Sequence, residues 1–137
     1  MSMNEFNKPV IEEFRANGGI VGGPWLGVPL LLLTTTGAKS GQPRTNPLGY
    51  CVVDDRMVVI ASYNGAPDHP AWYRNLAADP IVTIEAGSER FTARAISLDG
   101  DAWERAHTEF LRRNADIASH HARTTRKIPY VAFERIE

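Results

Sequence analysis

The sequence predicts an α+β fold in which mostly antiparallel strands form a small barrel or sandwich with helices at its edges. Two observations support this prediction. Extended runs of apolar residues follow one another directly and are joined by short turn signals, such as Asp54-Asp55-Arg56 and Gly87-Ser88. Helical patterns do not alternate regularly with these runs, so the sequence disfavours a doubly wound parallel sheet.

The first element is an amphipathic helix. Its apolar residues recur at helical spacing: Phe6, Val10, Ile11 and Phe14. We expect Asn7 to cap this helix, Pro9 to lie in its first turn and residues 17–19, Asn-Gly-Gly, to end it. A helix packed on the core is the first interpretation. A lid or a membrane-touching arm is the alternative, because a glycine-rich segment, residues 18–29, follows.

The remaining elements follow in order. Strands are expected at 30–36, 44–53, 57–62, 81–86, 90–98 and 129–136. A short helix over 70–78 begins with a proline. The longest helix is expected from Asp99 or Asp101 to about Ser119, with Trp103, Ala106, Phe110, Asn114 and Ile117 on one face. Cys51 lies inside a predicted strand, so we expect it to be buried and inert.

Composition limits the classes of function. The chain of 137 residues is expected to form one domain, 1–137, in which residues 1–23 are the N-terminal helix and a flexible lead-in. A net charge of -1 argues against nucleic-acid binding. A single cysteine is typical of a reducing cytoplasm, and neither a signal-peptide pattern nor a transmembrane run is present.

The loop after the leucine-rich strand carries the first candidate site. Gly37 and Gly41 leave backbone amides free to face a ligand. Lys39 supplies a point charge, and Arg44 a planar fork that suits phosphate or carboxylate. The spacing matches neither a Walker loop nor a Rossmann fingerprint. The pattern therefore indicates either an anion site or a solvated turn.

Residues 61–76 form the second candidate site. A loop followed by a helix N-terminus favours an anion or the polar edge of a ring. Trp72 and Tyr73 offer flat surfaces for an aromatic ring, and Asn75 offers a donor and an acceptor. The alternative is that one or both aromatic residues belong to the core.

The sequence does not indicate a metal site or a hydrolytic triad. The four histidines and one cysteine have no zinc-type spacing. His120 and His121 follow the predicted long helix, where a general acid could lie. No G-x-S-x-G nucleophile elbow occurs. If the protein is an enzyme, we expect a cofactor to perform the difficult chemistry.

Three blocks resemble a known family. The segments LLLTTTGAKSGQPRTNPL, IASYNGAPDHPAWYRNL and TTRKIPYVAFER resemble the deazaflavin-dependent nitroreductase family of actinobacteria. The resemblance covers about 24–134 in the same order, and the paired motifs T-G-x-K-S-G-x-x-R and P-x-W-Y-x-N-L are specific. It implies a split β-barrel and the cofactor F420, an 8-hydroxy-5-deazaflavin.

The resemblance also implies which residues bind the cofactor. The phosphate and polyglutamate tail would be held by the first loop, through Ala38, Lys39, Ser40, Gly41 and Arg44. The deazaflavin ring would be lined by two strand segments: Thr45, Asn46, Pro47, Leu48 and Gly49, and Ile60, Ala61, Ser62 and Tyr63. The other side would be closed by the short helix, through Ala71, Trp72, Tyr73, Arg74 and Asn75, with Trp72 and Asn75 the strongest candidates.

The implied reaction is hydride transfer from the reduced cofactor to an electron-poor acceptor, which would be an enone, an unsaturated lactone, a quinone or a nitro compound. Ser62 is the candidate for hydrogen bonding to the acceptor oxygen. Trp25, Asn114, Ile117 and His120 are expected to line the acceptor pocket. Family members place tyrosines where the last three stand, which makes this pocket less aromatic and disfavours bulky nitroimidazoles. Tyr63 also stands where members often carry a lysine.

A non-catalytic carrier of a deazaflavin, flavin or tetrapyrrole is the alternative from a different class, and a flavin mononucleotide oxidase is a third possibility. Open space above the ring would favour the enzyme, whereas a helix filling that space would favour the carrier. The expected partner is a small-molecule substrate, with peripheral membrane contact possible through the N-terminal helix.

Overall fold

The structure is a computed structural model that describes residues 3–23 and 27–136, with the backbone only for residues 3–6 and 64. The elements in chain order are α1 (Met3–Ala16), β1 (Leu30–Thr36), β2 (Pro43–Gly49), β3 (Cys51–Val53), β4 (Arg56–Ile60), η2 (Tyr63–Gly65), α2 (Ala71–Ala78), β5 (Ile81–Ala86), β6 (Glu89–Ser97), α3 (Gly100–Arg113), α4 (Ile117–Ala122) and β7 (Tyr130–Arg135). The expected strands and short helix all form, within one or two residues of their predicted ends at most positions.

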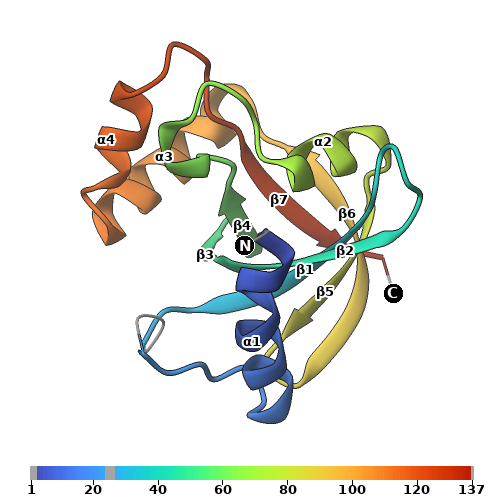
Figure 1. Cartoon of the computed structure of the whole chain (residues 1–137). Helices are drawn as coiled ribbons and strands as arrows, with labels where there is room; N and C mark the ends of the chain where they lie inside the picture. The colour runs from blue at the N-terminus through green and yellow to red at the C-terminus, as the bar shows by residue number, and fades with distance from the viewer. Residues whose placement is uncertain (1–2, 24–26, 137) are drawn as a thin grey trace.

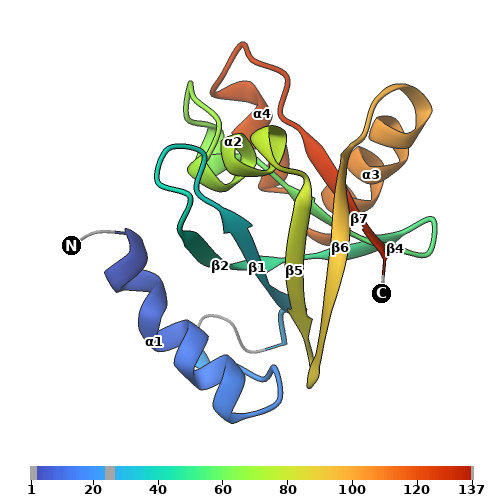
Figure 2. The same ribbon diagram turned by 90° about the vertical axis from the view of Figure 1, so that its right-hand side faces the viewer.

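The strands form one antiparallel sheet in the order β2-β1-β5-β6-β7-β4-β3. The edge strands β2 and β3 are consecutive in the chain and separated only by Tyr50. The predicted strand over 44–53 is therefore two strands, because the chain leaves β1 at Tyr50 and pairs next with β4. The curled sheet and its flanking helices are visible in Figures 1 and 2, and they confirm the α+β barrel prediction.

The leucine run in β1 separates two packed layers. Leu31 and Leu33 point into the barrel, where they join the main core with Val59 and Ile84. Leu32 points the other way, toward α1. Because successive strand residues face opposite sides, a continuous apolar run is expected only where both faces of a strand are covered. All four leucines are at most 5% exposed, as this arrangement requires.

Helix α1 packs on the outside of the barrel. Phe14 is buried against Leu32, and Val10 and Ile11 pack partly beside it. Arg15 forms a two-pronged contact with Glu85 of β5, with Nε and Nη2 donating at 3.0 and 2.9 Å. The helix begins at Met3, so the predicted Asn7 cap is wrong and Pro9 lies inside the helix.

The packing of α1 supports the first interpretation of this helix, because its apolar residues pack against the barrel. Among the described residues, no helix combines the length and the apolar character needed to cross a membrane.

The two predicted hairpins are confirmed. Asp54 and Asp55 both have positive φ angles, 53° and 62°, as a two-residue primed turn between β3 and β4 requires. Gly87 and Ser88 join β5 to β6. Helix α2 follows Pro70 directly, as predicted.

The predicted long helix over 99–119 is wrong in its length. Helix α3 ends at Arg113, and a separate short helix, α4, begins at Ile117. Asn114 interrupts the helix because its Oδ1 accepts a hydrogen bond from the backbone N–H of Asp116 at 3.0 Å. The predicted apolar face survives the break: Trp103, Phe110 and Ile117 still share one core with Tyr130.

Candidate active site

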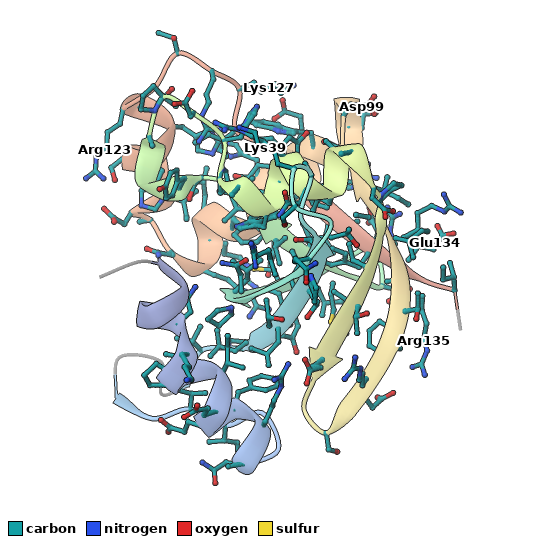
Figure 3. The ribbon with its side chains drawn as sticks, turned by 45° about the vertical axis from the view of Figure 1, so that its right-hand side comes forward. Lys39, Asp99, Arg123, Lys127, Glu134 and Arg135 are labelled. Carbon is teal, nitrogen blue, oxygen red and sulfur yellow. The ribbon has the colours of Figure 1, made fainter. Side chains whose placement is uncertain are left out.

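The cation loop (residues 37–44) connects β1 to β2 and presents two positive charges. The Gly37 N–H donates to Gln42 O at 2.8 Å and the Gly41 N–H donates to Gly37 O at 2.9 Å, so the loop closes on its own backbone. Lys39 lies in this loop (Figure 3), and Arg44 follows on β2. Both are exposed, and neither forms an ion pair with another described residue. These charges are therefore available to an anionic ligand.

Asn75 of α2 anchors the cation loop to the barrel. Its Oδ1 accepts a hydrogen bond from the Ala38 N–H at 3.0 Å, and its Nδ2 donates to the Thr35 hydroxyl at 3.1 Å. Asn75 is only 8% exposed. Its amide thus joins the two predicted cofactor segments, one before Lys39 and one on α2. The sequence marked this residue, but as a ligand contact and not as a link between loops.

The register of β2 divides the predicted ring-lining residues between two faces of the sheet. Asn46 pairs with Leu33 and Leu48 with Leu31, which places these two β2 residues on the inner face of the sheet. The intervening residues Thr45 and Pro47 pair with Thr34 and Leu32 on the face that α1 covers. Alternation along a strand separates the two sets, so the run 45–49 cannot line one ring as a block.

A cleft of about 310 Å³ lies between α1 and β2. Arg44 and Thr45 line it from the strand, and Lys8, Glu12 and Arg15 line it from the helix. Arg15 is already paired with Glu85, whereas Lys8 has no ion pair among the described residues. Lys8 was not identified from the sequence, because its position beside Arg44 depends on how the helix docks.

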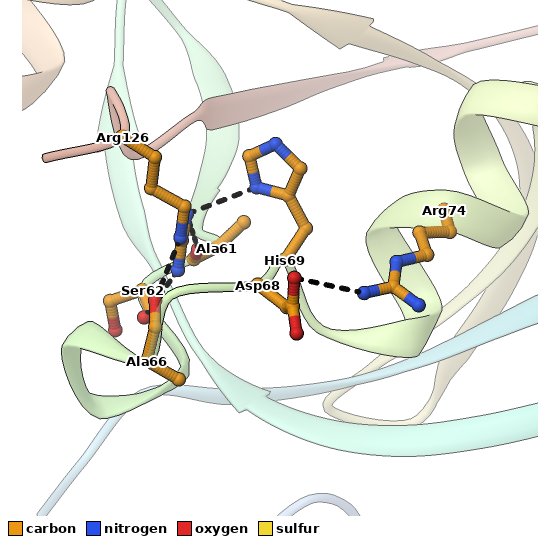
Figure 4. A network of polar contacts seen from close by, with 7 residues as sticks. All are labelled: Ala61, Ser62, Ala66, Asp68, His69, Arg74 and Arg126. Atoms are coloured by element: carbon orange, nitrogen blue, oxygen red, sulfur yellow. Dashed lines mark hydrogen bonds and ion pairs between the residues drawn. The ribbon is translucent and has the colours of Figure 1, made fainter. Parts of the chain in front are cut away.

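The serine loop (residues 61–69) follows β4, and Arg126 holds it in place. The Arg126 guanidinium donates to three backbone carbonyls: Ala66 O at 2.9 Å, Ser62 O at 2.8 Å and Ala61 O at 3.3 Å. It also contacts His69 Nδ1 at 3.0 Å. Figure 4 shows this network, with Asp68 and Arg74 beside it. In the sequence, Arg126 lies in the third block that carries the family resemblance, but no local pattern indicated that it would reach this loop.

The pKa of His69 agrees with its contact to Arg126. Burial lowers the pKa of His69, and the positive charges of Arg126 and Arg74 lower it further. A neutral imidazole can accept a hydrogen bond at Nδ1, which is the role that the Arg126 contact requires. Burial also lowers the pKa of Arg126, although a guanidinium remains charged at neutral pH.

Ser62 and His120 meet in the fold. The Ser62 Oγ and His120 Nδ1 atoms are 3.1 Å apart. Helix α4 approaches the serine loop closely at Gly65, whose φ is +77° and where an added Cβ would lie 2.6 Å from His120 O. Ser62 is 8% exposed. The predicted catalytic serine and one predicted pocket residue are therefore side by side.

The other predicted acceptor residues do not join this pair. Ile117 is buried in the core beneath α3 and α4. Asn114 ends α3 and is exposed, with its side chain bonded to the turn that follows. Trp25 lies outside the described residues.

The aromatic residues of α2 are largely used by the fold. Trp72 is 6% exposed and packs in the barrel core. Tyr73 is half-buried, its hydroxyl is 3.1 Å from Ser97 Oγ and its ring lies 4.7 Å from that of His69. Ala71 and Arg74 lie on the exposed side of α2, and Tyr63 is 50% exposed at the start of η2. Ile60 ends β4, and Ala61 follows it, fully buried in the core.

A second polar cluster lies on the opposite side of α4. The Tyr130 hydroxyl is 2.8 Å from His107 Nδ1 and 3.0 Å from His121 Nε2. Burial raises the pKa of Tyr130, and burial followed by the charges of His107 and His120 lowers the pKa of His121. A phenol has one proton, so it donates to one imidazole and accepts from the other. This cluster fastens α4 to α3 and β7. Among the described residues, no group of His, Cys, Asp and Glu could hold a metal ion.

Comparison with known proteins identifies the family. The model of the F420H(2)-dependent quinone reductase family matches residues 7–135. The chain belongs to this family. An F420H(2)-dependent quinone reductase of Mycobacterium tuberculosis (strain ATCC 25618 / H37Rv) is 38% identical over 126 residues, which cover 89% of this chain and 85% of the relative. The resemblance to F420-dependent reductases is thereby confirmed, and with it the assignment of this protein as an F420-dependent oxidoreductase.

Solved structures agree with the fold. An F420-H2 dependent reductase (FDR-A) has a TM-score of 0.70 and 34% identity over 77% of this chain and 94% of its own. A domain-swapped dimer has a TM-score of 0.73 and 30% identity over 97% of this chain and 100% of its own. The haem storage protein HutZ of Vibrio cholerae has a TM-score of 0.61 at 19% identity, over 95% of this chain and 90% of its own. That last likeness concerns the fold alone, and the split-barrel prediction is confirmed.

Proposed function

We propose that this protein reduces quinone-like acceptors with F420H2, and that the cation loop and the cleft beside it hold the anionic part of the cofactor. Membership of the quinone reductase family supports the reaction class. The single observation that carries the site is the pair of exposed cations, Lys39 and Arg44, neither of which has an ion pair among the described residues.

The residues present fit the cofactor chemically. A phosphate and several carboxylates require charge-assisted donors, and a lysine and an arginine on one loop supply them. Lys8 extends the positive surface along the cleft between α1 and β2. Asn75 would hold the cation loop in position rather than bind the ring, since both ends of its amide are already used.

F420H2 supplies a hydride when it is bound. The residues of this chain would orient the acceptor and stabilise the charge that develops on its oxygen. Ser62 is suited to this role because its hydroxyl lies at the end of β4 in a loop that Arg126 holds rigid. Asn46 and Leu48 lie on the inner face of the sheet and are the ring-lining candidates on β2. Enones, unsaturated lactones and nitro compounds stay in the proposal as secondary acceptors, and action in the cytoplasm agrees with the buried free thiol of Cys51.

The test is a titration followed by turnover. The purified full chain is titrated with F420H2, flavin mononucleotide and a nicotinamide cofactor, and the F420H2 complex is then mixed with a soluble naphthoquinone. We expect binding of F420H2 and its oxidation only when the quinone is present. A coumarin-type enone and a nitroimidazole tested in the same way would rank the secondary acceptors.

Two other outcomes would change the proposal. Binding of F420H2 without oxidation by any acceptor would support the carrier alternative. Binding of flavin mononucleotide in place of F420H2 would overturn the cofactor assignment and leave the barrel unaffected.

A further inference from the structure

We propose that His120 supplies the proton that Ser62 passes to the reduced acceptor, so that the two residues form a proton relay. The inference rests on the proposed function, in which Ser62 binds the acceptor oxygen. Ser62 follows β4, and His120 lies on α4, 58 residues later in the sequence. Ser62 Oγ and His120 Nδ1 are 3.1 Å apart.

The geometry of the pair suits a relay. A hydroxyl group donates one hydrogen bond and accepts two. His120 Nδ1 is the one partner of Ser62 Oγ among the described residues, so the oxygen keeps the capacity to bond an acceptor. The His120 side chain is 14% exposed, so solvent can return a proton to the ring after the transfer.

Several contacts hold the two groups in position. Arg126 Nη2 fixes the Ser62 carbonyl at 2.8 Å. Gly65 lets the backbone of α4 approach η2 at His120. His121 Nε2 secures the other side of α4 through the Tyr130 hydroxyl at 3.0 Å. A group that must transfer a proton benefits from this restraint, because transfer requires hydrogen-bond distance throughout.

The proton balance is simple. Hydride addition to a quinone places two electrons on the acceptor and a negative charge on its oxygen. The Ser62 O–H bond breaks as its proton bonds to that oxygen, and the proton on His120 Nδ1 moves to Ser62 Oγ. The imidazolium becomes a neutral imidazole that keeps its proton on Nε2. A proton from solvent then restores the charged ring.

The charged and titratable groups near the ring lie on α4, at its two ends and in the segment that follows it. Asp116 Oδ2, at the start of α4, lies 3.8 Å from His120 Nε2, beyond hydrogen-bond distance and 69% exposed, so its attraction is weak. His121 lies next along α4, and Arg126 faces the pair across the Ser62 carbonyl. Arg123 follows α4, and its Cβ lies 2.8 Å from where a Cβ added at Gly65 would stand.

A purely structural role is the competing explanation, in which the His120–Ser62 bond only fastens α4. His120→Gln separates the two, because the amide keeps a hydrogen bond to Ser62 but cannot carry a titrating proton. We expect the single-turnover rate of naphthoquinone reduction to fall by about 10²-fold, the lower end for loss of a general acid. The rate of the parent should decline as the pH rises, because a neutral imidazole has no proton at Nδ1 to give, and this decline should be absent in the variant.

Glu104→Gln is the control, with the same change to glutamine at an exposed residue of α3. It should retain the pH dependence of the parent. If His120→Gln has the rate and pH profile of the parent while F420H2 turnover persists, the relay is overturned and the proposed function stands. If the parent reduces none of the acceptors, the proposed function fails and the relay with it.

A measurement on the cofactor-free protein tests the contact itself. Nitrogen-15 NMR of the imidazoles reports which ring nitrogen carries the proton. We expect neutral His120 to carry it on Nε2 and to accept from Ser62 at Nδ1, and Ser62→Ala should shift this tautomer balance. A His120 spectrum that Ser62→Ala leaves unchanged would overturn the inference.

Discussion

The cation loop and the serine loop each follow a barrel strand and each involve arginine, but they use it in opposite ways. In the cation loop, Lys39 and Arg44 are exposed and form no ion pair with the described residues. Next to the serine loop, Arg126 donates hydrogen bonds to three backbone carbonyls and contacts His69 Nδ1. An exposed arginine such as Arg44 can offer its N–H groups to a ligand. Arg126 cannot, because backbone carbonyls already accept its hydrogen bonds and it therefore shapes the loop.

The largest effect is expected from removing Arg126. Arg126→Ala removes a donor from three loop carbonyls, of which Ser62 O keeps the Gly65 N–H at 2.8 Å, and we expect the free energy of unfolding to fall by about 3 kcal/mol. Urea unfolding followed by circular dichroism measures this change. Arg74→Ala is the control, since its ion pair with Asp68 is long, 3.9 Å, and exposed, and it should cost less than about 0.5 kcal/mol. Equal stability of the two variants would remove the distinction between the loops.

Lys39→Ala and Arg44→Ala should affect binding instead of folding. Each should weaken F420H2 binding by about 1.5–3 kcal/mol, as expected for loss of a charge-assisted bond, with the free energy of unfolding changed by less than about 0.5 kcal/mol. Isothermal titration measures the affinities. Arg94→Ala, an exposed arginine on β6, is the control that should bind normally. Unchanged affinity in both loop variants would show that the cofactor does not use this loop.

Asn75 anchors the cation loop to β1 and α2, so its removal should modestly lower both the stability of the fold and the affinity for F420H2. Asn75→Ala breaks the bonds to Ala38 and Thr35, and we expect the free energy of unfolding to fall by about 1–2 kcal/mol together with a loss of F420H2 affinity. Thr35→Val breaks only the second bond. If Thr35→Val weakens binding as much as Asn75→Ala, the anchoring of Ala38 is not what positions the cation loop.

The smallest effect concerns pH. Folding lowers the pKa values of His69 and His121 below the ordinary value of 6.5, so the unfolded chain binds protons more readily than the folded one. Their contribution to stability is complete above about pH 6.5 and is lost as the pH falls. Urea unfolding at pH 8 and pH 5 should show lower stability at pH 5. His69→Gln should reduce this difference, because glutamine does not titrate; an unaltered difference would contradict the assignment.

The sequence by itself determined the strands, both hairpins, the short helix α2 and the family. Period-two patterns, turn residues and Pro70 act over a few neighbouring positions, so they can be read without the fold. The paired motifs around Lys39 and Trp72 likewise identified the cofactor class, which the family match confirms.

Only the tertiary structure decided which of these residues meet. Trp72 faces the core and Asn75 the cation loop because α2 docks across β1 in one orientation. The helix break at Asn114 turns α4 toward Ser62, and Arg126 reaches the serine loop from a segment with no pattern of its own. Contacts between positions about sixty residues apart depend on how whole elements pack, and local propensity contains no information about that packing.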